Sequence, residues 1–339
     1  MNIPLSLFRP WLLALCLLAP ATLFAVGYEP ETIPEGAGPS GPQRRTVGLF
    51  TRLFNSPSRT NAAEQLAYAQ ELEAKGALRS ALKAYKAAFL FWQTSAEAPQ
   101  ALLAYARLLE KTGRYSPAFD EYQYLISTYS GLFPYDAVIE SQYALANQVR
   151  TEVYGRWFFG IGFVSPERAI PYYFQVASNA PNWRLAPEAL FNVGSIFQQN
   201  KQYPEAIRVY SDVQTRYPNT DEAKMAAYQL VRCMLDITLS QPNNNQYRAE
   251  TRAALALFLR DHPDSPHFEK MKRALSELDA MQAKTLMERA YVYERARKNK
   301  VAADVYRQLI AEFPKSPEAE KAKLKIAELT PPAEQGSQK

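Results

Sequence analysis

The chain of 339 residues is 47% apolar and holds only 13 glycines, a composition that supports a sizeable buried core and favours helices. Its net charge of +5 is spread over mixtures of Lys, Arg, Asp and Glu. The sequence therefore lacks the clustered basic stripe of a nucleic-acid-binding protein, and we expect no nucleic-acid partner.

The N-terminal residues have the pattern of a secretory signal peptide. Arg9 precedes an apolar run, residues 11–24, which is followed by small residues at Ala25 and Gly27. The run is shorter than the roughly 20 apolar residues that a membrane-spanning helix needs. We therefore predict a signal peptide at residues 1–27 and export of the rest of the chain, with an uncleaved membrane anchor as the alternative.

The chain has two cysteines, Cys16 and Cys233. Lipidation of Cys16 is not expected, because bacterial lipoprotein processing needs a small residue where Leu15 stands. Cleavage after the signal peptide leaves Cys233 alone, so no intramolecular disulfide is possible even in an oxidising compartment. We expect Cys233 to be a small buried residue of a helix.

Residues 28–60 are predicted to form a flexible tether without helical periodicity. The segment is rich in residues that interrupt helices, namely Pro30, Pro34, Pro39, Pro42, Pro57, Gly36, Gly38, Gly41 and Gly48. Within it, residues 47–54 form an apolar turn flanked by arginines, which we expect to pack on the first repeat. Contact with a membrane surface or a partner is the alternative.

From residue 61 onward a short pattern recurs: an alanine, an aromatic residue four positions later, an apolar residue three further on, and then a proline. Full copies are Ala169, Tyr173, Val176, Pro181, then Ala206, Tyr210, Val213, Pro218, and Ala302, Tyr306, Leu309, Pro314. Copies without the proline are Ala81, Tyr85, Ala88 and Ala118, Tyr122, Leu125, and a degenerate copy is Thr251, Leu255, Phe258, Pro263. The alanines at 81 and 118, and at 169 and 206, are 37 residues apart. This period predicts helical hairpins that resemble the tetratricopeptide repeat.

Each position of the pattern has a physical role. An alanine lets two helices cross closely, the aromatic residue lies on the same face and fills the space between pairs, and the proline ends the second helix. A single pair cannot bury its apolar face, so the pairs must stack. We predict an all-α fold, an α-solenoid of about six tetratricopeptide-type helix pairs plus a C-terminal helix over 316–329.

The predicted pairs divide into an N-terminal set at 61–181 and a C-terminal set at 182–329, followed by a disordered tail at 330–339. Three Ser-Pro pairs, at 165, 265 and 316, are expected to begin helices with the serine as N-cap. Two segments break the period. We expect the aromatic residues 155–163 to form a loop folded onto the core, with a partner-binding lip as the alternative. Residues 242–245 are predicted to be a solvated turn.

The sequence holds no phosphate-binding loop, no nucleophile elbow and no metal-binding spacing of Cys and His. His262 and His267 are the only histidines, and they flank Pro263 and Pro266 at a predicted helix break. We therefore expect a protein that is not an enzyme and that has no catalytic, cofactor-binding or metal site.

A protein-binding groove is predicted along the first helix of successive pairs, because apolar, aromatic and Arg side chains recur on one face there. The residues proposed to line this groove are Gln100, Leu103, Arg107, Phe191, Ser195, Met287, Tyr291 and Arg295.

Residues 187–329 resemble the BamD family, the tetratricopeptide component of the outer-membrane β-barrel assembly machine. The stretches that carry the resemblance are APEALFNVGSIFQQNKQYPEAIRVYSDVQTRYPNT, AALALFLRDHPDSP and MERAYVYERARKNKVAADVYRQLIAEFPKSPEAEKA. A long helix over about 268–298 is also typical of that family.

The resemblance implies a periplasmic scaffold in peripheral association with the outer membrane. Its C-terminal repeats would dock a β-barrel insertase, and its N-terminal repeats would receive unfolded outer-membrane proteins. Two alternatives remain open. One is a general periplasmic adaptor of a cell-wall division, pilus or secretion complex, and the other is an enzyme that uses His262 or His267.

Overall fold

The computed structural model describes residues 45–46, 55–154, 162–241 and 244–329. The chain divides into two units, Met1–Arg44 and Arg45–Lys339, and every described residue belongs to the second. The predicted signal peptide, most of the predicted tether, the apolar turn at 47–54 and the predicted C-terminal tail lie outside the described residues. None of the helices among the described residues is long and apolar enough to span a bilayer.

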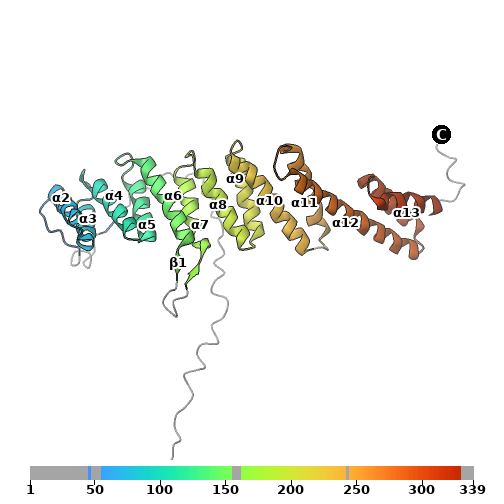
Figure 1. The fold of residues 1–339 in the computed structure, drawn as a ribbon, viewed down its shortest axis with the longest axis horizontal. Helices are drawn as coiled ribbons and strands as arrows, with labels where there is room; N and C mark the ends of the chain where they lie inside the picture. Colours follow the sequence, from blue (N-terminus) through green and yellow to red (C-terminus); the bar gives the residue numbers. More distant parts are fainter. Residues whose placement is uncertain (1–44, 47–54, 155–161, 242–243, 330–339) are drawn as a thin grey trace, which may run out of the picture. The chain divides into compact units, whose positions relative to one another are not determined.

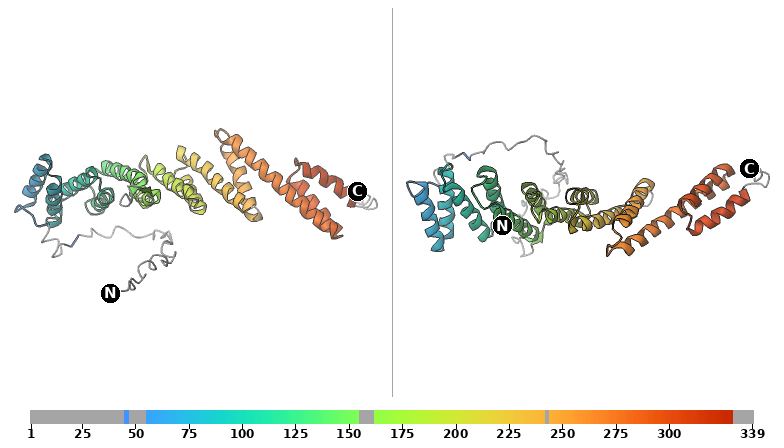
Figure 2. Two further views of the ribbon diagram at one scale, coloured as in Figure 1. Left: turned by 60° about the horizontal axis from the view of Figure 1, so that its bottom comes forward. Right: turned by 90° about the horizontal axis from the view of Figure 1, so that it is seen from above.

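The described part of the chain forms six helical hairpins and a last helix, in which each helix packs against the next one along the chain (Figures 1 and 2). This arrangement confirms the predicted all-α solenoid. The hairpins are α2 (Ala62–Ala74) with α3 (Leu78–Phe91), α4 (Ala98–Lys111) with α5 (Tyr115–Thr128), α6 (Tyr135–Thr151) with α7 (Ile170–Asn179), α8 (Ala186–Gln199) with α9 (Tyr203–Arg216), α10 (Asp221–Ser240) with α11 (Asn245–Asp261), and α12 (Phe268–Arg295) with α13 (Asn299–Glu312). The last helix is α14 (Pro317–Leu329).

The predicted proline stops are confirmed in four hairpins. Helices α7, α9, α11 and α13 each end two residues before the proline of the pattern. A proline lacks an N–H and restricts the residue before it, so the second helix of the hairpin cannot continue. The predicted cap at Ser316 is also confirmed, since its Oγ accepts a hydrogen bond from the Ala319 N–H at 3.1 Å.

The other two predicted serine caps are wrong. Ser165 precedes a 3₁₀ helix, Pro166–Ala169, and accepts no capping hydrogen bond. Ser265 accepts a hydrogen bond from the His267 N–H, but α12 begins later, with His267 as the N-cap residue. In both places the chain makes an extra turn before the helix starts, so the Ser-Pro pair lies in that turn.

The turn inside four of the hairpins uses one backbone conformation. Gly76, Gly113, Lys201 and Arg297 follow the first helix with φ between 58° and 75°. The residue after each donates its N–H to a carbonyl five positions earlier, as Ala77 does to Leu72 and Lys298 to Tyr293. This Schellman arrangement suits glycine, and a residue with a Cβ in that conformation costs about 1–2 kcal/mol.

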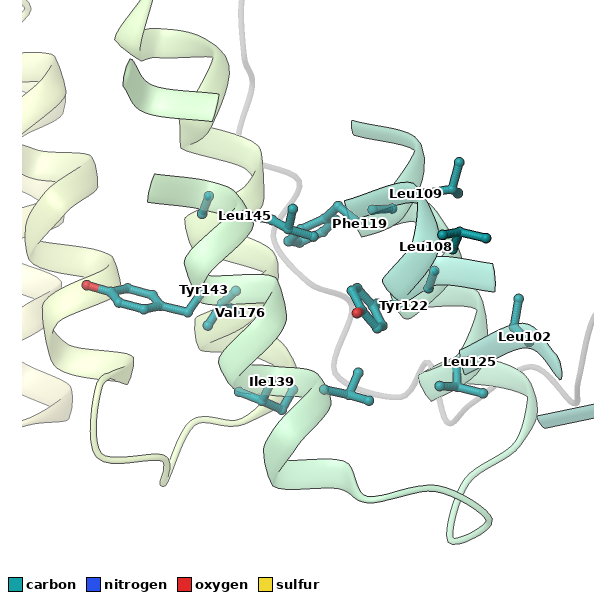
Figure 3. Packing of buried hydrophobic residues seen from close by; sticks show 14 of the residues in the cluster. Leu102, Leu108, Leu109, Phe119, Tyr122, Leu125, Ile139, Tyr143, Leu145 and Val176 are labelled. Atoms are coloured by element: carbon teal, nitrogen blue, oxygen red, sulfur yellow. The ribbon is translucent and has the colours of Figure 1, made fainter. Parts of the chain in front are cut away.

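The alanine and tyrosine of the pattern form the centre of five of the six hairpins. Ala81, Ala118, Ala169, Ala206 and Ala302 are completely buried, and the tyrosines four positions later are at most 2% exposed. Figure 3 shows part of this packing, in which Tyr122 of α5 lies among Leu102, Leu108 and Leu125. The predicted role of these residues as core is therefore confirmed.

Each of these buried tyrosines also donates a hydrogen bond to the first helix of its hairpin. Four of the acceptors stand 12 residues before the tyrosine: Glu73 for Tyr85 (2.7 Å), Glu110 for Tyr122 (2.9 Å), Gln198 for Tyr210 (2.8 Å) and Glu294 for Tyr306 (2.9 Å). Tyr173 uses Asn147 at 2.6 Å, 26 residues earlier, because an insertion separates α6 from α7. The hydroxyl thus stays paired although the ring is buried.

The degenerate copy of the pattern lies on α11, at the same place in its hairpin as the other copies, but it makes a different contact. Thr251 replaces the alanine and is fully buried, and its hydroxyl lies 2.7 Å from that of Thr238. The Thr251 hydroxyl also donates to the Tyr247 carbonyl at 2.9 Å. A buried threonine pair therefore replaces the alanine contact in the hairpin of α10 and α11.

The insertion between α6 and α7 contains a short antiparallel pair, β1 (Val153–Tyr154) and β2 (Phe163–Val164). Residues 155–161 lie outside the described residues. The prediction of a loop folded onto the core is wrong at its described end, because pairing with β1 leaves Phe163 64% and Val164 48% exposed.

Candidate protein-binding groove

A groove with a volume of about 540 Å³ lies between the first helices of two successive hairpins, α10 and α12. Helix α11 packs against both of these helices. The side chains that line the groove are Arg232, Leu235, Asp236 and Leu239 of α10, and Lys270, Met271, Arg273, Ala274, Glu277, Leu278 and Met281 of α12.

The spacing of these residues explains why they meet. On α10 they follow each other at intervals of three, one and three positions, so they share one face of the helix. The α12 residues from 270 to 281 follow each other at intervals of one to three positions and cover one broad face of that helix. Both helices therefore present one mixed apolar and charged face to the space between them.

The floor of the groove is apolar, and its rim holds two large exposed side chains. Met271 and Leu278 are each 1% exposed and belong to a core cluster with Leu255 and Phe258 of α11. Leu239 is 62% and Met281 is 43% exposed. Burying these two side chains under a partner would contribute about 1.5–3 kcal/mol each.

Charged side chains of both signs surround this apolar floor. Arg232 and Lys270 both lie 5.8 Å from the centre of the Tyr228 ring, and Lys270 donates to the Tyr228 hydroxyl at 3.2 Å. Asp236 and Glu277 provide carboxylates in the same groove. An apolar centre with a polar rim is the usual anatomy of a protein-binding site.

A second cavity, of about 370 Å³, lies at the turn between α11 and α12 and is lined by both histidines. The His267 ring stacks on Tyr228 at 3.6 Å, and the His262 ring lies 5.1 Å from Phe258. Both imidazoles are thus packed against aromatic rings. Among the residues that the structure describes, no group of three or more His, Cys, Asp or Glu side chains is arranged to hold a metal ion.

Cys233 lies on α10, next to the groove residue Arg232, and its side chain is completely buried. Burial, and to a smaller extent the nearby Asp236, raise the pKa of its thiol to about 12. The thiol therefore stays protonated and unreactive at neutral pH, which confirms its predicted role as a small core residue.

The residues that the sequence proposed for a groove lie on α4, α8 and the second half of α12, and none of them lines the groove described above. Gln100, Arg107 and Arg295 are exposed, Tyr291 is 40% exposed, and Leu103, Phe191 and Ser195 are partly buried. The Phe191 ring lies 5.4 Å from that of Tyr210 and packs on the core. Binding at the seven positions other than Met287 stays a prediction.

Met287 is a core residue and not a groove residue. Its side chain is 5% exposed and belongs to a cluster with Ala302, Tyr306 and Leu309 of α13. Met287 is buried because Ala283, Met287 and Ala290 lie on the face of α12 that packs against α13.

Sequence reasoning missed the contribution of α10 to the groove. The signal was present, because Leu235 and Leu239 stand four positions apart with Arg232 and Asp236 on the same face. The repeat pattern does not specify how far apart the first helices of neighbouring hairpins lie, so the sequence could not predict where a groove forms between them. That distance opens the groove at α10 and α12.

Two segments of the chain match the family model of the tetratricopeptide repeat, residues 188–220 and 273–316. They correspond to the hairpin of α8 and α9 and to most of the hairpin of α12 and α13. These two segments therefore match the tetratricopeptide repeat, and they lie in the helical-repeat fold described above. No protein of curated function matches the sequence significantly.

Several solved structures, tetratricopeptide repeat proteins among them, resemble the chain at low sequence identity. A repeat protein from Parabacteroides merdae is 13% identical and covers 79% of this chain and 98% of its own, with a TM-score of 0.29. YrrB, a repeat protein with an unusual peptide-binding site, is 17% identical, covers 67% and 100%, and has a TM-score of 0.28. PilF of Pseudomonas aeruginosa is 14% identical, covers 78% and 97%, and has a TM-score of 0.25. These scores are too low to indicate what this chain binds.

Proposed function

We propose that this tetratricopeptide-type scaffold is a non-catalytic, exported protein that holds a segment of a partner protein in the groove between α10 and α12. The observation that carries the proposal is the groove itself, with its buried apolar floor, its exposed Leu239 and Met281, and its charged rim. Such a surface suits a segment that inserts apolar side chains and pairs its polar groups at the edge.

We further propose that the scaffold works in the assembly of β-barrel proteins of the outer membrane. The support for this step is the resemblance of residues 187–329 to the BamD family and the 28-residue helix α12, which is typical of that family. Under this proposal the C-terminal repeats dock a β-barrel insertase, and the N-terminal repeats receive unfolded outer-membrane proteins. The protein then acts in the periplasm, in peripheral association with the outer membrane.

The proposal predicts that charges at the groove rim abolish capture of the partner. Leu239→Glu and Met281→Glu would bury an unpaired carboxylate under the partner, so we expect at least a tenfold loss of bound partner. The measurement is affinity capture of the tagged chain from envelope extracts, quantified by mass spectrometry. Leu257→Glu on α11 and Val301→Glu on α13 are matched controls, because these side chains are 51% and 42% exposed and do not line the groove.

Three results are informative. Recovery of a large β-barrel protein by the wild type and the controls, but not by the groove variants, supports both parts of the proposal. Groove-dependent recovery of division, pilus or secretion proteins without a β-barrel protein supports the groove and replaces the assembly role with the adaptor role. Equal recovery by all variants contradicts the groove.

A further inference from the structure

One residue that precedes the helical repeats is held in a site on their surface. Arg45 places its guanidinium 4.1 Å from the centre of the Tyr124 ring, and its Nη1 donates to both carboxylate oxygens of Glu121 at 2.9 and 2.7 Å. Its backbone is recognised as well. The Arg45 carbonyl accepts a hydrogen bond from Gln93 Nε2 at 2.7 Å, and the Arg45 N–H donates to the Tyr124 hydroxyl at 3.4 Å.

The side chains that hold Arg45 come from two neighbouring hairpins and are fixed by their own contacts. Glu121 and Tyr124 lie on α5, and Gln93 follows the end of α3. Buried Tyr129 donates its hydroxyl to the Gln93 carbonyl at 2.9 Å, and its ring meets the Tyr124 ring edge to face at 6.4 Å. The site is therefore built by the fold and does not need the arginine to assemble it.

The Arg45 contact is not required to attach the preceding chain segment to the first hairpin. Gln65 does this, since its Oε1 accepts from the Ser58 and Arg59 N–H groups at 2.9 and 3.0 Å while its Nε2 donates to the Ala84 carbonyl at 3.1 Å. Asn61 caps α2 through the Glu64 N–H. Arg45 instead lies against α5 and the residues that follow α3.

The site has spare binding capacity, and its ion pair with Arg45 is partly open to solvent. Gln93 Oε1 is buried and has no hydrogen-bond partner among the described residues, so it can accept a further donor. The Arg45 and Glu121 side chains are 34% and 13% exposed. A partly solvated ion pair of this kind contributes only about 1 kcal/mol, so a segment that makes the same set of contacts can compete with Arg45 for the site.

We propose that Glu121, Tyr124 and Gln93 form a receptor for an arginine in an irregular, basic segment of a partner protein, and that Arg45 occupies this receptor until the partner displaces it. A carboxylate, an aromatic face and a backbone-directed amide together recognise the charge, the planar shape and the main chain of an arginine residue. This site is separate from the groove between α10 and α12, and it stands whether or not that groove binds a partner.

The test uses a labelled probe peptide with the sequence of residues 42–48, PQRRTVG, and fluorescence anisotropy with the full-length protein. Arg45→Ala vacates the receptor, so we expect it to bind the probe at least tenfold more tightly than the wild type. Adding Glu121→Gln to this variant should remove about fivefold of that affinity, the equivalent of about 1 kcal/mol. A control peptide in which the second arginine is replaced by alanine should bind neither protein.

The thermal unfolding of each variant, followed by circular dichroism, separates binding from folding. The proposal predicts that Arg45→Ala keeps a midpoint within a few degrees of the wild type while it gains affinity for the probe. If Arg45→Ala gains no affinity for the probe peptide, the Arg45 contact serves only to attach the preceding segment to the repeats, and the proposal is overturned. Equal binding of the two peptides would overturn it as well, since recognition would then not depend on arginine.

Discussion

Gly194→Ala is expected to destabilise the protein by about 1–2 kcal/mol, although the same change in a helix normally stabilises by about 1 kcal/mol. Gly194 lies in the middle of α8, and a Cβ at this position would stand 2.6 Å from Cε1 and 2.8 Å from Cδ1 of Tyr210. The Tyr210 ring has nowhere to move, because it is completely buried and its hydroxyl donates to Gln198. The overpacking cost therefore exceeds the gain in helix propensity.

The sign of the change distinguishes the two effects, and urea unfolding measures it. In a Tyr210→Leu background the ring is gone, so Gly194→Ala should become neutral or stabilising, and a double-mutant cycle reports the coupling. The equivalent positions in three other hairpins are Ala69, Ala106 and Ala290, each 16 residues before the tyrosine of its hairpin. A stabilising effect of Gly194→Ala in the wild-type background would show that α8 and α9 are not packed this closely.

Tyr122→Ala should cost about 3–5 kcal/mol, because Tyr122 is fully buried at the centre of the hairpin of α4 and α5. Most of this loss comes from the ring. Burial raises the pKa of the Tyr122 hydroxyl, which therefore remains protonated and donates to Glu110 at neutral pH. Tyr122→Phe keeps the ring and removes only this hydrogen bond, so we expect it to cost about 1 kcal/mol.

Chemical denaturation gives the two free energies of unfolding, and hydrogen exchange shows where protection is lost. In a stack of hairpins each unit contacts only its neighbours, so Tyr122→Ala should lower protection in α4, α5 and α6 before it affects α13 and α14. Equal losses for the Ala and Phe variants would mean that the hydroxyl, not the ring, stabilises the hairpin. Uniform loss of protection along the chain would contradict local coupling.

Much of the fold could be predicted from the sequence because each position of the repeat pattern has a local effect, such as ending a helix or requiring burial. The prolines at 181, 218, 263 and 314 end helices wherever they occur, and the alanine and tyrosine positions require burial in any stacked hairpin. The acceptors 12 residues before the tyrosines were also present in the sequence. They are glutamate or glutamine near the end of a helix, where such residues are common for other reasons.

Other features depend on contacts between residues that the repeat pattern does not relate to each other, so they could not be predicted from it. Lys201 and Arg297 take the turn conformation that Gly76 and Gly113 take elsewhere, because the hairpin geometry imposes it on whatever residue stands there. The pairing of β1 with β2 joins residues across a segment that reads as an irregular loop. The Arg45 site likewise brings together residues 76 positions apart.

The groove between α10 and α12 was not among the positions proposed from the sequence, and binding at those positions, Met287 apart, stays a prediction. A groove along the first helices follows from the architecture, whereas its position at α10 and α12 depends on how far apart those two helices lie. Met287 shows that residue spacing alone does not reveal which face of a helix is buried. Its spacing from Tyr291 placed it on the predicted binding face, but one face of α12 must pack against α13, and Met287 belongs to that face.

Site-specific photocrosslinking in living cells tests most directly whether the groove between α10 and α12 holds a partner protein. A photoreactive phenylalanine derivative would replace Leu239 or Met281 at the rim, and Leu257 or Val301 as exposed controls. We predict a discrete adduct of one partner at the two rim positions and none at the controls. Adducts of equal yield at all four positions, or only at the controls, would contradict the assignment of this groove as the binding site.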